Sequence, residues 1–386
     1  MNKNKQVLFG VIAAVAVICV VVALVINRGG EEKDQGVIKI GAILPLSGNT
    51  AVIGEPKRRA LEIAFEELNG TNGINFEILF QDSMGSPRDG VAAFQKMLNN
   101  RDIRYFYIDL TPIVNSSIPL IKQNKVITFA GSAEPEITDQ SDYLFRLFAG
   151  GDQEIQLMVE SLRQDSIDGI FVLHTDDLYG INAYRYLEKE FLQQGGKILG
   201  HENYPMNNMD FRSALLKAQS VNPQKIILLG YGNEYASLFR QAIELSIQPD
   251  MFFCNVGGSN KAVIELSRDL TEGMSFVSPR FTYLMMNNTL EPEMEYFVDQ
   301  YRKKYDELPD FRSAYVYDTI KILHFVWSGH KDHVKVDSVR TLIKQVKDFK
   351  GASGTITFLE NGDALTDLVV AQFVDGKIVI KPENYE

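Results

Sequence analysis

The sequence predicts an α/β protein with parallel sheets, and three observations lead to this prediction. Short apolar runs bounded by turn residues alternate with helical patterns along most of the chain. The first strand, helix and strand follow one another at a spacing typical of a βαβ unit, whose crossover gives parallel pairing. The length of 386 residues is typical of two domains beyond any targeting segment. Because ligands of such sheets bind beyond the carboxyl ends of the strands, the loops at these ends are the candidate site.

The stretch Val37–Gly54 contains the first strand and the first of these loops. Its apolar β-formers stop at Pro45 and a Ser-Gly-Asn cluster, which is typical of a strand buried on both faces. A helix is predicted over Glu55–Asn69, where an Asn-Gly pair closes it, and a second strand over Phe76–Phe80. The loop Leu46–Gly54 therefore lies at the carboxyl end of a strand.

Elements of the same two kinds continue to the end of the chain. In the first part, strands are predicted over Ile103–Leu110, Lys125–Phe129 and Tyr143–Leu147, with a helical piece over Ile118–Gln123. A second series has helices over Glu154–Asp165, Ile181–Gln194, Phe211–Gln219 and Tyr235–Leu245, and strands over Gly169–His174, Lys197–Tyr204, Lys225–Leu229 and Met251–Asn255. Helices over Glu293–Lys304, Ser313–Trp327 and Val336–Phe349 follow, and then a hairpin from Leu368–Val374 to Lys377–Ile380 through an Asp-Gly turn.

Three stretches marked by glycine or proline indicate where the chain crosses between two domains. The first is Ala149–Gly151, which contains a Gly pair. The second is the strand Met274–Ser278, which Pro279 ends, and the third is Gly351–Phe358.

The N-terminal residues predict a membrane segment. A basic leader, residues 1–6, precedes Val7–Ile26, which has no charged residue and at about 1.5 Å per residue spans roughly 30 Å, one hydrocarbon core. The leader places the N-terminus in the cytoplasm and the body outside. A cleaved signal peptide is the alternative, but Leu24–Gly30 fits a cleavage site poorly, and Ile18 stands where a lipoprotein site at Cys19 needs a small residue. We therefore expect residues 7–26 to be a transmembrane anchor and residues 27–36 to be a polar linker.

Charge and motifs argue against several classes of function. Lys+Arg 39 against Asp+Glu 50 give a net charge of −11 without a basic block, so nucleic acid is not an expected partner. Neither the 2 Cys nor His330 and His333 have convincing metal-site spacing, and we expect no metal and no cofactor. The nearest match to a dinucleotide-binding fingerprint ends in the bulky Tyr235, and Walker A, zinc-protease and nucleophile-elbow motifs are absent. We therefore expect no catalytic residue.

Seven segments, in this order, resemble the leucine/isoleucine/valine-binding family of solute-binding proteins. They read IKIGAILPLSG, AGSAEPEIT, LFRLF, HTDDLYG, LLGYGNE, TEGMSFVSP and GTITFLENGD, and the resemblance covers nearly all of Val37–Ile380. The family consists of type I periplasmic binding proteins that serve ABC importers. The resemblance implies two Rossmann-like α/β lobes with parallel sheets, joined by three crossovers, and a ligand held between them. With the crossings above, we expect one lobe to comprise 37–148 and 278–350, and the other 149–277 and 351–386.

The resemblance also implies binding positions in the first lobe. Amino-acid binders of the family use backbone groups and a hydroxyl in a stretch that reads Gly131-Ser132-Ala133 here. Alanine replaces the usual threonine, and Ser132 is the substitute hydroxyl. The family's first-lobe loop matches Asp109 to Thr111, for which an ordinary strand-to-helix turn is the alternative interpretation. Ser47, in the loop after the first strand, completes this set.

In the second lobe, the matched positions are two tyrosines and one apolar residue. The family's Tyr-Gly motif matches Tyr179, and a second cleft tyrosine matches Tyr231; packing roles are the alternatives. The family's ammonium-binding acid falls on Val256, and an apolar side chain cannot compensate a buried ammonium. Asp109 or Asp176 could supply the charge from another loop. We therefore expect a small amide, carboxylate or other polar ligand, with branched-chain amino acids bound weakly or not at all.

Three classes of function follow from this pattern. The first is an extracytoplasmic solute-binding protein, anchored to the cell membrane by its N-terminal helix and partnered by an ABC transporter permease. The second is the same clamp used as a ligand-sensing receptor module, which would act through a partner because Met1–Lys5 is too short for a signalling domain. The third is an enzyme, which the motif search does not support.

Overall fold

The computed structural model describes residues 37–381 apart from 135, 149, 206–207 and 330–334. The predictions for residues 1–36, including the membrane segment 7–26, and for His330 and His333 concern residues outside this part of the chain. Among the helices of the described part, none combines the length and the apolar character that crossing a membrane requires.

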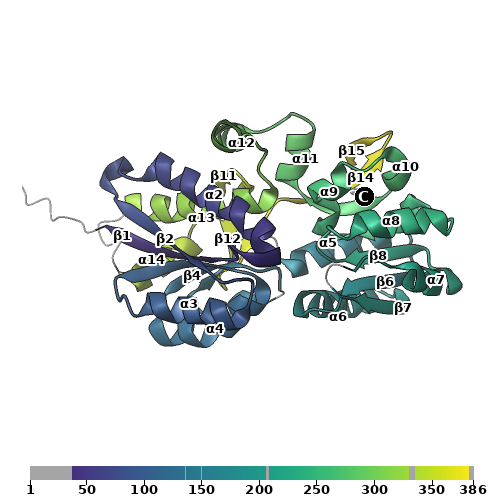
Figure 1. Ribbon diagram of the computed structural model, residues 1–386, viewed down its shortest axis with the longest axis horizontal. Coiled ribbons are helices and arrows are strands. Elements are labelled where there is room, and N and C mark those ends of the chain that lie inside the picture. The colour runs from purple at the N-terminus through teal and green to yellow at the C-terminus, as the bar shows by residue number, and fades with distance from the viewer. Residues whose placement is uncertain (1–36, 135, 149, 206–207, 330–334, 382–386) are drawn as a thin grey trace, which may run out of the picture. The chain divides into compact units, whose positions relative to one another are not determined.

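Five parallel strands form the first sheet, in the order β2-β1-β3-β4-β5. Its strands are β1 (Ile38–Leu44), β2 (Phe76–Asp82), β3 (Ile103–Asp109), β4 (Ile127–Gly131) and β5 (Leu144–Phe145). Successive side chains of a strand point to opposite faces. Ile40 and Leu44 therefore pack with α2 (Ala51–Leu68) and α13 (Phe311–Ser328), whereas Ile43 packs with α3 (Pro87–Leu98) and α4 (Thr111–Asn124), on the other face (Figure 1).

The second sheet has the order β15-β14-β10-β9-β8-β6-β7. Its strands are β6 (Gly169–Thr175), β7 (Lys197–Tyr204), β8 (Lys225–Leu229), β9 (Phe252–Cys254), β10 (Ser275–Pro279), β14 (Leu368–Val374) and β15 (Lys377–Ile380). Helices α5 (Gly151–Gln164) and α6 (Leu178–Gln193) pack on one face, and α7 (Arg212–Ser220) and α8 (Tyr235–Glu244) on the other. The predicted hairpin is confirmed: β14 and β15 are antiparallel, and Asp375 and Gly376 both have positive φ, as this turn requires.

The remaining elements connect the two sheets or cover their edges. They are the helices α9 (Lys261–Ile264), α10 (Arg268–Thr271), α11 (Arg280–Met286), α12 (Pro292–Tyr305) and α14 (Val336–Lys344), the 3-10 turns η1 (Gly48–Thr50), η2 (Thr71–Gly73), η3 (Ile137–Gln140), η4 (Pro249–Met251) and η5 (Val256–Ser259), and the strands β11 (Phe349–Gly351), β12 (Gly354–Phe358) and β13 (Ala364–Leu365). We call the first sheet with β11–β13, α2–α4 and α12–α14 the first lobe, and the second sheet with α5–α11 the second lobe.

In the described part of the chain, three passages join the lobes. The first lies between β5 and α5, and the other two differ from the expected residues. Helix α11 contacts β10, β14 and β15, whereas α12 contacts α2. The second passage therefore follows Met286, because Pro279 ends β10 and leads directly into α11 rather than out of the lobe. Gly351–Phe358 is not a crossing: most of it forms β12, whose Phe358 ring contacts Phe129 in the first sheet. The third passage instead follows β13, before β14 pairs with β10.

A buried arginine joins the first of these passages to β13, the strand before the third passage. Arg146, beside β5, is fully buried, and its Nε donates to Asp363 Oδ1 at 2.8 Å. Its Nη2 lies 3.1 Å from Asp152 Oδ1 on α5 and also donates to Asp363. The backbone of Arg146 bridges Asp363 as well, so the segment that leaves β5 is held beside the residue that precedes β13.

Other elements also differ from the sequence prediction, among them three helices. Helix α3 was not predicted, although Ser86 caps it and Pro87 occupies its first turn. Helix α4 begins at Thr111 and not at Ile118, because a proline is compatible with the first turn of a helix. Helix α14 ends at Lys344, since Phe349 belongs to β11.

Candidate functional site

The loops at the carboxyl ends of strands in both lobes line one cavity of about 440 Å³, which we call the interlobe cavity. This volume lies in the range of small-molecule sites, which is about 300–1,000 Å³. The first lobe contributes residues from the loop after β1, from α2, from the ends of β3 and β4, and from the start of α13. The second lobe contributes the loops after β6, β8 and β9, and α11 closes one side.

Most of the residues predicted from the sequence line this cavity. Those that line it are Asp109, Thr111, Gly131, Ala133, Tyr179, Tyr231 and Val256. Ser47, Ser132 and Asp176 are not among the lining residues. Ser132 is buried, and its hydroxyl lies 2.9 Å from that of Thr111, so it is held within the first lobe. Asp176 is exposed, and the neighbouring Asp177 lines the cavity in its place.

Two tyrosines form the second-lobe wall of the cavity. The ring centroids of Tyr179 and Tyr231 lie 5.2 Å apart. Tyr231 donates its hydroxyl proton to Asp177 Oδ2 at 2.5 Å, and Tyr179 accepts a hydrogen bond from Asn255 at 2.6 Å. Burial raises the pKa of both tyrosines, so both keep their protons at neutral pH. The wall therefore offers flat apolar surface together with a phenol donor at Tyr179.

A buried ion pair forms the opposite, first-lobe wall. Lys57 Nζ lies 2.5 Å from Asp109 Oδ1, and the two residues are 3% and 0% exposed. Asp109 Oδ2 is also buried, and it has no hydrogen-bond partner within the described part of the chain. Gly131 has no side chain where a Cβ would lie 2.2 Å from Asp109 Oδ1, so the neighbouring strand leaves room for the carboxylate.

The lysine of this pair was not identified from the sequence, although the sequence contained a signal for it. Lys57 lies one helical turn before Ala60 and Leu61, on the buried face of α2. A cation on an otherwise apolar helix face needs a partner charge. A charge in that position therefore predicts a buried ion pair even where the partner is unknown.

A second group that sequence reasoning missed lies at the start of α13. Asp310 caps this helix, and its Oδ1 accepts the Ser313 N–H at 2.8 Å. Arg312 Nη1 lies 3.6 Å from the other oxygen of Asp310 and lines the cavity. The aromatic rings of Phe148 and Phe311, 6.1 Å apart, line it between the lobes.

The loop at Val256 has a carboxyl group behind it. Glu154, on α5, is buried and accepts the Val256 N–H. Burial raises the pKa of Glu154 to about 7, an effect that this hydrogen bond and the charge of Arg312 only partly offset. Glu154 is not itself a lining residue. The acid that the family resemblance places in this loop is thus absent from the surface of the cavity, and an acid beneath the loop orders its backbone.

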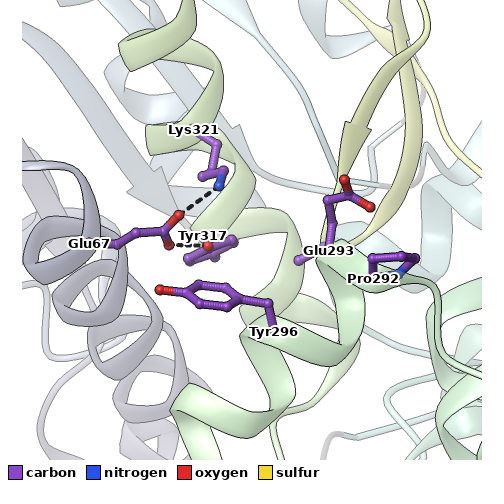
Figure 2. Close-up of a pocket in the computed structure, with 7 residues that line it drawn as sticks. Glu67, Pro292, Glu293, Tyr296, Tyr317 and Lys321 are labelled. Atoms are coloured by element: carbon purple, nitrogen blue, oxygen red, sulfur yellow. Dashed lines mark hydrogen bonds and ion pairs between the residues drawn. The ribbon is translucent and has the colours of Figure 1, made fainter. Parts of the chain in front are cut away.

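A smaller hollow of about 230 Å³ lies within the first lobe, away from the interlobe cavity. Figure 2 shows Glu67 of α2 between Lys321 and Tyr317 of α13, with Tyr296 of α12 beside them. Lys321 Nζ donates to Glu67 at 2.8 Å and the Tyr317 hydroxyl also donates to it, so these groups satisfy one another. Because only the first lobe lines this hollow, a ligand there would not join the lobes. Among the described residues, no three His, Cys, Asp or Glu side chains are grouped to hold a metal ion.

Comparisons with known proteins agree with this arrangement. A family model described as "Periplasmic binding protein" matches residues 37–377. The chain is 26% identical over 310 residues to Leu/Ile/Val-binding protein homolog 7 of Brucella abortus (strain 2308), covering 75% of each chain. Its fold is similar to that of a leucine binding protein LivK from Thermotoga maritima MSB8, with a TM-score of 0.77, 22% identity, and coverage of 90% of this chain and 98% of the other. It is also similar to a solute binding protein of an ABC transporter from Rhodopseudomonas palustris BisB5 in complex with 3,4-dihydroxy benzoic acid, with a TM-score of 0.75, 20% identity, and coverage of 89% and 95%.

Proposed function

Because this chain belongs to the leucine/isoleucine/valine-binding family of type I periplasmic binding proteins, we propose that it is the extracytoplasmic solute-binding protein of an ABC importer. The observation that carries the proposal is the interlobe cavity, which strand-end loops of both lobes line. A ligand that touches both walls is bound most tightly when the lobes are close together, so it shifts the population toward the closed state. The closed, loaded form is then the species that a permease would recognise.

The ligand is, on this proposal, a small polar molecule of the amide or carboxylate type, with the seven predicted residues that line the cavity as the first candidates for its contacts. The names of the similar proteins include a leucine binder and a binder of 3,4-dihydroxy benzoic acid, so this fold accommodates different ligands. The cavity has Val256 where the family's ammonium-binding acid is expected, and burial of an unpaired ammonium is costly. Branched-chain amino acids are therefore poor ligands.

Mass spectrometry of the intact chain under ligand-retaining conditions tests the role itself. We expect one small polar molecule to co-purify with each chain and to be lost on unfolding. A preparation that carries no small molecule, and that takes up none from an extract of its own cells, would contradict a solute-binding role.

Isothermal titration calorimetry with leucine, isoleucine and valine tests the ligand class. We expect weak or undetectable binding of all three. Micromolar affinity for any of them, about −8 kcal/mol at the standard state, would refute this part of the proposal. Loss of that binding in Asp109→Ala would then identify Asp109 as the partner of the ammonium.

The permease and the membrane are the partners that this role requires. A receptor module would use the same closure but would transmit it to a kinase or chemoreceptor. Cross-linking of the loaded chain in its own membranes separates the two, because an importer component is captured with a permease and a receptor module with a signalling protein.

A further inference from the structure

The carboxylates that line the interlobe cavity differ in how many of their oxygens accept hydrogen bonds from the protein. Asp177 accepts from Tyr231 with one oxygen and from the Gly180 N–H with the other. Asp310 is held by the start of its own helix, and Glu265 is exposed at the mouth. Asp109 alone among these, in the described part of the chain, keeps one buried oxygen, Oδ2, without a partner, whereas Lys57 and the Tyr107 hydroxyl lie beside its other oxygen. A buried acceptor of this kind is costly unless a donor reaches it, so the oxygen indicates where a donor of the ligand binds.

The charge of this acceptor is already compensated. Lys57 Nζ lies 2.5 Å from the other oxygen of Asp109, and both residues are almost completely buried. The pair has no net charge, so a ligand that brings an ammonium or a carboxylate to it leaves one charge uncompensated in a buried place. A neutral group incurs no such penalty and gains a hydrogen bond to a charged acceptor, which is among the stronger kinds.

We propose that the Lys57–Asp109 pair selects a ligand whose first-lobe end is an uncharged N–H or O–H donor, such as a carboxamide or a hydroxyl. Asp109 Oδ2 accepts the ligand's proton donor, and Lys57, whose ammonium has three donors, donates to the ligand's carbonyl or hydroxyl oxygen. The inference rests on the proposed solute-binding function and deepens it, because it names the residues that set the charge of the ligand. The neighbouring lining residues Val52, Ile53 and Leu110 are apolar, so the group that follows this end is apolar as well.

Matched small molecules test the inference directly. Two carbon skeletons, one branched aliphatic and one aromatic, each provide an amide, an alcohol, an amine and a carboxylate: isovaleramide, isopentanol, isopentylamine and isovalerate, and benzamide, benzyl alcohol, benzylamine and benzoate. Calorimetry with the full-length chain in mild detergent measures all eight. We expect an amide or an alcohol to bind on the order of tenfold more tightly than the charged molecules of its skeleton, because only these avoid a buried unpaired charge. The inference is overturned where an amine or a carboxylate binds most tightly, or where no amide or alcohol binds.

Variants of Lys57 and Asp109 give a second readout, which is the order of preference among the eight molecules and not the affinity for any one of them. Lys57→Met leaves a net negative charge and should shift the preference toward the amines, whereas Asp109→Asn leaves a net positive charge and should shift it toward the carboxylates. The double variant Lys57→Met/Asp109→Asn is neutral again and should restore the preference for amides and alcohols. Asp176→Asn is the matched control, since it removes an exposed charge outside the cavity. An unchanged order of preference in both single variants, each shown to be folded by circular dichroism, would contradict the assignment.

Failure of the solute-binding role and failure of the charge selection by Lys57 and Asp109 give different results. If the protein does not bind solutes, neither the eight probes nor a co-purified molecule will be found on it. If it binds solutes but the pair does not choose their charge, a co-purified molecule or a charged probe will bind and the variants will keep its preference.

Discussion

At the scale of single residues, the burial of Glu154 makes the stability of the folded protein depend on pH. Its pKa rises to about 7 because it is buried on α5, against an ordinary value of 4.5. The folded state therefore binds its proton more strongly than the unfolded state does. The contribution of this group to the free energy of unfolding is constant below pH 4.5. It falls by an amount on the order of 3 kcal/mol as the pH rises from 4.5 to 7, and it stays low above pH 7.

Glu154→Gln should remove this dependence. The difference in free energy of unfolding between the variant and the natural chain should shift in favour of the variant as the pH rises from 5 to 8, because glutamine does not ionise. Urea unfolding at four pH values in this range measures it. Glu160→Gln, on the exposed side of the same helix, is the control and should show no such shift. Parallel curves for Glu154→Gln and the natural chain would show that the buried carboxyl titrates normally.

The sequence predicted site residues well at strand ends and poorly elsewhere. Asp109 and Tyr179 follow apolar runs, and parallel sheets gather such positions on one edge. Lys57 lies in a helix and Arg312 at a helix start, where no strand-end rule applies. The choice between Asp176 and Asp177 depends on helix capping: Asp177 turns inward because its side chain caps α6. Nothing in two adjacent aspartates reveals which of them is the cap.

At the scale of elements, the same contrast separates strands from crossings. Lys197–Tyr204 and Lys225–Leu229 agree with the structure to the residue. Lys225–Leu229 is a buried parallel strand with a continuous apolar run between turns, whereas Lys197–Tyr204 is an edge strand with alternating exposure. Glycine and proline predict the crossings less well, because these residues mark any break in an element. Pro279 ends a strand within one lobe, and Gly351 and Gly354 belong to a hairpin. Which lobe a segment joins depends on tertiary contacts that a local pattern does not contain.

The arginine between the crossings should be important for stability. Arg146→Met would leave Asp363, which is 3% exposed, without its partner, and removal of one member of a buried pair costs about 3–5 kcal/mol. Arg163→Met is the control, since Arg163 pairs with Asp168 at 2.8 Å on the surface and such pairs contribute about 1 kcal/mol or less. Urea unfolding at neutral pH compares the two. Equal losses of stability would mean that the Arg146 cluster is no stronger than a surface pair.

At the scale of the whole molecule, the cavity predicts closure. A ligand that contacts Asp109 in the first lobe and Tyr179 in the second stabilises the form in which these walls approach each other. Small-angle X-ray scattering of a chain that starts at Gln35, with and without a ligand shown to bind by calorimetry, should give a smaller radius of gyration with ligand. A bound ligand that leaves the scattering curve unchanged would rule out the clamp.

The N-terminal residues give a prediction about localisation. Residues 7–26 have no charge and follow a basic leader, so the full-length chain should stay with membranes after a high-salt wash. A chain that starts at Gln35 should stay in the supernatant and bind the same ligand. N-terminal sequencing of native material decides between the two interpretations of this segment, because a mature end near Gly30 would identify a cleaved signal peptide instead of an anchor.

The position of Arg146 has a consequence for the kind of motion that closure can be. The Arg146 guanidinium, through Asp152 and Asp363, ties the start of the second lobe after β5 to the residue that directly precedes β13. Two chain segments that are bound to the same side chain cannot slide along each other, but each of them can still bend there. Translation of one lobe past the other is therefore opposed. Rotation of the lobes about an axis through the Arg146 cluster remains as the low-energy motion. The cleft would then open and close by hinge rotation. Its two walls would meet in the same register each time a ligand is bound.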